Sequence, residues 1–144
     1  MSFTVRQSPL VDQQEKILRN KQKKRYEEFL DDLARRGCAA LGYRLAGPTP
    51  LAHMCVKHIV GTLRVVVAFA ENDEIWVLLV GYHDESDPGI NVYSTLYDLA
   101  GIDTAPSGKR TKPPCCGEDG DAPLVDEAFV DEFVERAKRL ARER

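Results

Sequence analysis

The sequence predicts an α+β fold: a small antiparallel sheet with an N-terminal helical hairpin packed on it, plus a C-terminal helical extension. The main observation is a pair of apolar runs, Leu63–Ala70 and Ile75–Gly81, separated by the polar residues 71–74. Both runs are rich in β-branched and aromatic residues and too short for helices, so they predict an antiparallel hairpin. Because the apolar character is continuous rather than alternating, we expect central strands covered on both faces.

Upstream of this hairpin, the pattern predicts one short strand and then helical structure. Residues 3–6 alternate apolar and polar, and Ser8 followed by proline is typical of a helix start. Within 26–34, apolar residues recur at helical spacing, and Gly37 follows two arginines as at a helix end. We therefore expect residues 8–36 to form a helical hairpin or one long broken helix.

Further elements follow from local pattern and suggest a division of the chain. A short strand over Cys55–Val60 and a short helix over Val92–Ala100 complete a domain spanning residues 1–102. Residues 103–122 contain many glycines and prolines without periodicity, which predicts a linker. Residues 123–144 have an apolar stripe with acids before bases, as in an amphipathic helix.

Charge is distributed unevenly along the 144 residues, which are enough for one domain. The net charge of −3 combines +6 over residues 1–69, −5 over 70–112 and −4 over 113–144. A basic N-terminal half fits a polyanionic partner. The acidic remainder argues against broad, nonspecific binding of nucleic acid.

The sequence gives expectations about compartment and cofactors. No apolar run approaches the roughly 20 residues that span a bilayer, and the N-terminal residues do not resemble a signal peptide. We therefore expect a cytoplasmic protein without a membrane partner, whose cysteines, including the adjacent Cys115 and Cys116, are reduced. His53, Cys55 and His58 offer zinc-type ligands beside that pair, but the spacing matches no familiar finger, so we expect neither metal nor cofactor.

Four short motifs stand in and around the predicted hairpin. Residues 55–57 read CVK, and residues 61–67 read GTLRVVV, which places an arginine at the start of a strand. Residues 80–83 read VGYH, a glycine and two polar aromatic residues after the second strand. Residues 91–94 read NVYS at the start of the short helix.

In their order and spacing, these motifs resemble those of the RelE/ParE-like toxins of bacterial toxin–antitoxin pairs, and the VGYH element is similar to the YoeB branch. The resemblance covers about residues 3–100 and includes the order of strands and helices. It implies a RelE/ParE-like fold and a toxin-type endoribonuclease that cleaves mRNA, usually on the ribosome, under control of an antitoxin protein. The chain departs from the pattern because it is acidic and because residues 101–144 have no counterpart in the minimal toxin.

The resemblance, together with side-chain chemistry, gives a candidate catalytic set. His83 would act as acid or base, Arg64 would clamp the phosphate, and Tyr93 would orient or stack a base. Lys57 and His58 would add positive charge or share proton transfer. The candidate RNA-binding residues are Tyr82, Lys21, Lys23, Lys24 and Arg25.

Two other functions remain open from the sequence. The first alternative is a non-catalytic member of the superfamily that binds a protein target such as gyrase. The second is an unrelated small α+β interaction domain. The acidic C-terminal helix has two candidate roles as well. It either docks over the basic catalytic face within the same chain, as an antitoxin would, or it covers exposed sheet or forms a homodimer.

Overall fold

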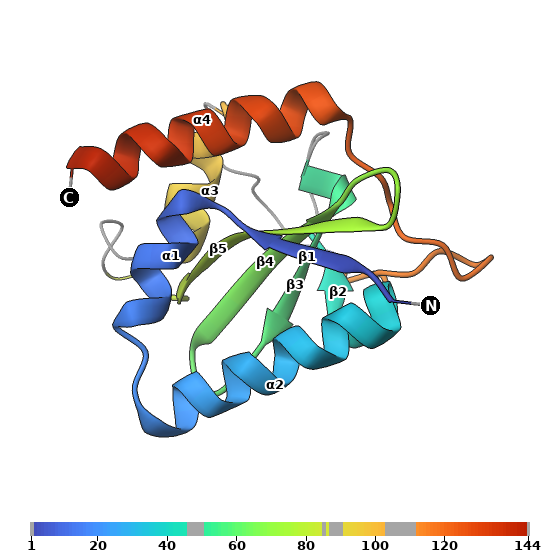
Figure 1. Cartoon of the computed structure of the whole chain (residues 1–144), viewed down its shortest axis with the longest axis horizontal. Helices are drawn as coiled ribbons and strands as arrows, with labels where there is room; N and C mark the ends of the chain where they lie inside the picture. The colour runs from blue at the N-terminus through green and yellow to red at the C-terminus, as the bar shows by residue number, and fades with distance from the viewer. Residues whose placement is uncertain (1, 46–50, 85, 87–90, 103–111, 144) are drawn as a thin grey trace.

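The computed structural model describes residues 2–45, 51–84, 86, 91–102 and 112–143. Its centre is a five-stranded sheet with helices on both faces (Figure 1). The strands are β1 (Thr4–Gln7), β2 (Tyr43–Arg44), β3 (Met54–His58), β4 (Leu63–Phe69) and β5 (Glu74–Tyr82), and their spatial order is β1-β5-β4-β3-β2.

The sheet is mixed, so the prediction of a purely antiparallel sheet is wrong in one strand. β2, β3, β4 and β5 pair antiparallel along the row, whereas β1 runs parallel to β5. The β4–β5 hairpin is closed by a tight turn in which Asn72 and Asp73 have positive φ angles, and such a turn enforces antiparallel pairing. No tight turn joins β1 to β5, because residues 8–73 lie between them, so the direction of β1 is not set by a turn.

Within the described ranges, four α-helices cover the sheet: α1 (Pro9–Lys16), α2 (Asn20–Arg36), α3 (Val92–Ala100) and α4 (Glu127–Glu143). The side chain of Ser8 accepts a hydrogen bond from the backbone N–H of Val11 and caps α1, as expected. Instead of one broken helix, the chain forms two: α2 lies along one face of the sheet, while α1 packs against β5 and α4 (Figure 1).

The continuous apolar character of the hairpin is explained by a core on each face. Val65 and Val67 of β4 belong to the cluster that also contains residues of α2. Val66 and Ala68, which alternate with them, belong to the cluster built with α3 and α4. The prediction of central strands buried on both sides is therefore confirmed.

The C-terminal helix is part of the second core. α4 packs against α1 and α3, with Phe133 and Ala137 fully buried. Ahead of this helix, Leu124 forms a β-bridge with Phe69 at the end of β4. Of the expected linker, residues 103–111 lie outside the described part of the chain. The following residues run beside β2, where the backbone N–H of Arg44 donates to the carbonyl of Pro113.

The expectation of reduced cysteines is wrong in this structure. Cys38 is bonded to Cys116, and Cys55 is bonded to Cys115, with Cα–Cα distances of 5.3 and 5.8 Å. Adjacency does not prevent pairing, because the two neighbouring cysteines reach different elements: one bonds to the turn after α2 and the other to β3. Among the described residues, no helix is long and apolar enough to cross a membrane.

Candidate functional site

The sheet sorts the candidate residues between its two faces. Side chains alternate along a strand, and in β3 Cys55 belongs to the core under α2 while Val56 belongs to the core under α3. Lys57 therefore lies on the α2 face and His58 on the α3 face. In β4, Val65 belongs to the core under α2 and Val66 to the core under α3. The same alternation therefore places Arg64, the residue before Val65, on the α3 face.

Four predicted catalytic residues come together at one end of the α3 face. His58 lies directly opposite Arg64 in the β3–β4 pairing, and Arg64 lies opposite Gly81 of β5. His83 follows β5, and its ring meets the ring of Tyr93 edge to face with the centroids 5.0 Å apart. The strand ends thus gather two imidazoles, a guanidinium and a phenol, although they are as far apart in sequence as residues 58 and 93.

Gly81 permits the close approach of α3 to β5 that brings Tyr93 into this cluster. A Cβ atom at position 81 would lie 3.3 Å from Cβ of Val92, tighter than ordinary van der Waals contact. The helix start is also fixed by Asn91, a buried polar residue whose amide donates to the hydroxyl of Ser94. The glycine after the second strand, noted as a motif, has a packing role in placing the helix.

The structure adds Tyr43, which the sequence did not single out. Its hydroxyl lies 3.1 Å from Nε2 of His58, and the two rings meet edge to face at 5.5 Å. The ammonium of Lys112 sits 5.1 Å from the centroid of the Tyr43 ring, as in a cation–π pair. Tyr43 belongs to the two-residue strand β2, which carries no periodic signal, so only the tertiary pairing with β3 reveals it.

Arg64 is anchored by one end of its guanidinium. Nη1 donates to the carbonyls of Gly61 at 2.8 Å and Leu63 at 3.3 Å. Nε is buried and has no hydrogen-bond partner among the described residues. An arginine held in this way keeps donors for an incoming oxyanion, and burial makes an unpaired donor costly until such a ligand arrives.

The site is electropositive around its aromatic groups. The pKa of His58 is lowered from its usual value by partial burial and then by its electrostatic interactions with Arg64, Lys112, His83 and Lys57. Burial is the largest cause of the raised pKa of Tyr93, followed by its interaction and hydrogen bond with Tyr43. At neutral pH, His58 is therefore uncharged and Tyr93 is protonated, beside a permanent cation.

The remaining candidates lie on the α2 face at the same end of the sheet. The hydroxyl of Tyr82 donates to Oε1 of Gln22 in α2 at 3.2 Å. Lys57 borders a groove of about 420 Å³ between α2 and the end of β3, and the next residue, His58, borders it as well. The four predicted RNA-binding bases of α2 are all exposed, and one of them lines this groove: Lys21, Lys23, Lys24 and Arg25.

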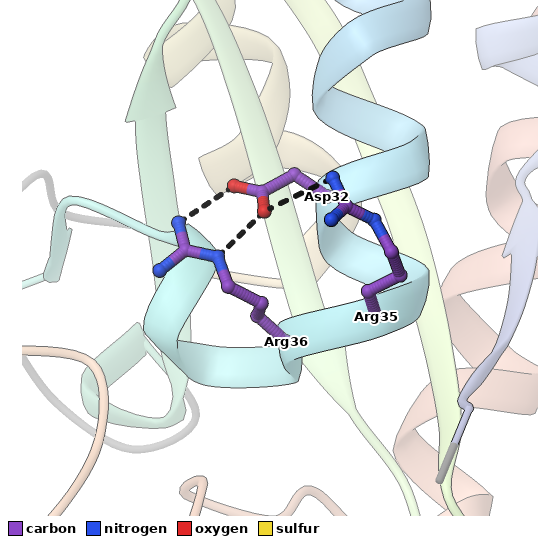
Figure 2. Close-up of polar contacts among 3 residues, drawn as sticks. All are labelled: Asp32, Arg35 and Arg36. Carbon is purple, nitrogen blue, oxygen red and sulfur yellow. Dashed lines mark hydrogen bonds and ion pairs between the residues drawn. The ribbon is translucent and has the colours of Figure 1, made fainter.

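Acidic side chains neutralise part of this second face. Asp32 is held by Arg36 through contacts of 2.5 and 2.7 Å and lies 3.8 Å from Arg35 (Figure 2). The hydrogen bond from Arg36 is the largest cause of the lowered pKa of Asp32, to which Lys57 also contributes. The groove therefore presents ion pairs on its α2 side, whereas His58 at its other border interacts with Arg64, Lys112 and Lys57.

The structure does not assemble the zinc-type ligands noted in the sequence. Nδ1 of His53 lies 3.0 Å from the carbonyl oxygen of Leu124. Cys55 and Cys115 are bonded to each other. Within the described ranges, no group of three or more histidine, cysteine, aspartate or glutamate residues is arranged to hold a metal ion.

No protein-family model matches this chain, and no curated protein matches it either.

Proposed function

We propose that this protein is a toxin-type endoribonuclease of the RelE/ParE-like superfamily, restrained by an antitoxin. One observation carries the proposal: Arg64 is flanked by His58 across the strand pair and by the His83–Tyr93 ring pair at the start of α3. The order of elements from β1 to α3, with two helices between the first strand and the antiparallel row, supports the proposal, although the row has four strands because the two-residue strand β2 is added to the layout that the resemblance implies.

The arrangement suits cleavage of RNA by its own 2′-hydroxyl. In this reaction the 2′-oxygen bonds to the phosphorus, the bond to the 5′-oxygen breaks, and a cyclic phosphate and a 5′-hydroxyl end result. His58, uncharged at neutral pH, takes the proton of the 2′-hydroxyl, and His83 supplies the proton that the 5′-oxygen needs. Arg64 stabilises the extra negative charge on the phosphate oxygens.

The flanking residues fit the handling of an RNA strand. Tyr93 lies beside His83 but is only 7 % exposed, so its phenol would orient a neighbouring group rather than stack on a nucleobase. The exposed bases at the start of α2 and Tyr82 lie around the same end of the sheet and would follow the phosphate backbone. α4 contacts α1 and the carbonyl end of α3, where Arg136 donates to the carbonyl of Leu99.

The test is induced expression in a bacterial host, with growth followed and the ends of cellular mRNA mapped. We expect growth arrest with new internal mRNA ends for the wild type, and loss of both in Arg64→Ala and His83→Ala. Arg139→Ala is the matched control, because this exposed arginine lies on α4, away from the cluster. Arrest without new mRNA ends, unchanged in both variants, would instead support inhibition of a protein target.

A further inference from the structure

Tyr43 connects the two halves of the candidate site. Its hydroxyl lies 3.1 Å from Nε2 of His58 on one side and interacts with the phenol of Tyr93 on the other. The ring of Tyr93 in turn contacts the ring of His83 edge to face. The order of groups across Arg64 is therefore imidazole, phenol, phenol, imidazole.

We propose that Tyr43 is a positioning residue of this site: it donates its hydroxyl proton to Nε2 of His58 and accepts one from Tyr93, which fixes the tautomer of His58. This tautomer leaves the acceptor lone pair on Nε2, and in the substrate complex the 2′-hydroxyl would replace the Tyr43 phenol at that atom. That exchange rests on the proposed function, whereas the tautomer itself does not.

The direction of the hydrogen bonds follows from a count of protons. A phenol has one proton to donate, so Tyr43 donates either to His58 or to Tyr93. The hydrogen bond between the two phenols contributes to the raised pKa of Tyr93, as expected of the phenol that donates. Tyr43 then has its own proton for Nε2, and neutral His58 carries its ring proton on Nδ1.

The surroundings of His58 favour this neutral form from every side. The groups that interact electrostatically with it are Arg64 of β4, Lys112 beside β2, the imidazole of His83 beyond β5, and Lys57 from the other face of its own strand. A protonated Nε2 would also have to donate, which would reverse the bond from Tyr43. Charge and hydrogen bonding therefore act in the same direction on one ring.

Tyr43 is held rigidly enough to act in this way, although β2 has only two residues. Tyr43 pairs with Val56 in β3, and the next residue, Arg44, donates from Nε to the carbonyl of Cys115 at 3.0 Å. Cys115 is itself bonded to Cys55 in β3. The disulfide thus fixes the segment that carries Lys112 against β3, the strand with which Tyr43 pairs.

The test uses the full chain labelled with ¹⁵N at histidine and two-bond ¹H–¹⁵N correlation spectra across a pH titration. In the wild type we expect neutral His58 to be the Nδ1–H tautomer. In Tyr43→Phe we expect a shift toward the Nε2–H tautomer and a rise in the pKa of His58 toward its usual 6.5. Tyr26→Phe is the matched control, because it deletes a phenol that donates to Gln7 on the other face; it should leave His58 unchanged.

An Nε2–H tautomer in the wild type would overturn the proposal without any variant, and so would a Tyr43→Phe spectrum in which neither tautomer nor pKa moves. Where the protein cleaves RNA, Tyr43→Phe should lower kcat more than it changes KM and should move the acidic limb of the pH profile upward. If the protein cleaves no RNA, the proposed function fails, but the tautomer measurement still decides what Tyr43 does to His58.

Discussion

Lys57 and His58 are neighbours in the chain, yet they lie on opposite faces of the sheet. Lys57 helps to lower the pKa of Asp32 in α2, whereas His58 is hydrogen-bonded to Tyr43 and lies opposite Arg64. The sequence motifs place both residues in one catalytic set. The alternation of side chains along β3 separates them.

This separation predicts different effects of two adjacent substitutions on RNA cleavage. Removing an acid–base group typically costs about 10²–10⁴-fold in rate, so His58→Ala should lose at least about 100-fold in kcat. Lys57→Ala should lose less than about tenfold, because its charge reaches the site only from behind the sheet. The measurement is the single-turnover cleavage rate of an RNA oligonucleotide. Equal losses in both variants would contradict the assignment of faces.

The lowered pKa of His58 predicts a pH dependence of folding stability. Because the folded state holds the pKa below the usual 6.5, the unfolded chain takes up the proton first as the pH falls. The stabilising effect of neutral His58 is therefore complete above about pH 6.5 and is lost as the pH falls toward the folded-state pKa.

Chemical denaturation between pH 5 and 8 checks this, with the free energy of unfolding as the readout. His58→Gln should flatten that part of the profile. His53→Gln, which removes a histidine from beside Leu124 instead, should keep the slope due to His58. A wild-type profile that rises as the pH falls from 6.5 would show that the sign is wrong.

The two disulfides predict a large effect of reductant on stability. They join residues 78 and 60 positions apart, and a crosslink over such a separation typically stabilises a domain by about 2–5 kcal/mol. Protein purified without reductant should show no free thiols and should lose stability when a dithiol is added. A variant with all four cysteines changed to serine is the control and should not respond. Four titratable thiols in the unreduced, denatured protein would refute the pairing.

The position of α4 predicts that it is an integral part of the core. Phe133 is fully buried, so Phe133→Ala should cost about 3–5 kcal/mol of unfolding free energy. Phe129, on the same helix, is only partly buried, so Phe129→Ala should lower the free energy of unfolding clearly less. Denaturant melts of the two variants provide the comparison. Similar small losses in both would indicate a detachable appendage.

The sequence by itself determined the local elements. Continuous apolar runs predicted β4 and β5, which the structure places at Leu63–Phe69 and Glu74–Tyr82. Helical spacing predicted α2 and the short helix α3, whose bounds Val92–Ala100 match the expectation. These elements could be predicted because their period and end signals are encoded within a few residues.

Only the tertiary structure decided which groups meet. The direction of β1, the pairing of Cys38 with Cys116 and the meeting of His58 with Tyr43 all join segments distant in sequence. No local pattern carries that information, because such contacts depend on strand order and register across the sheet. The sequence motifs predicted that Arg64 and His83 belong to one site. The register of β3, β4 and β5 and the start of α3 determine which side chains surround them.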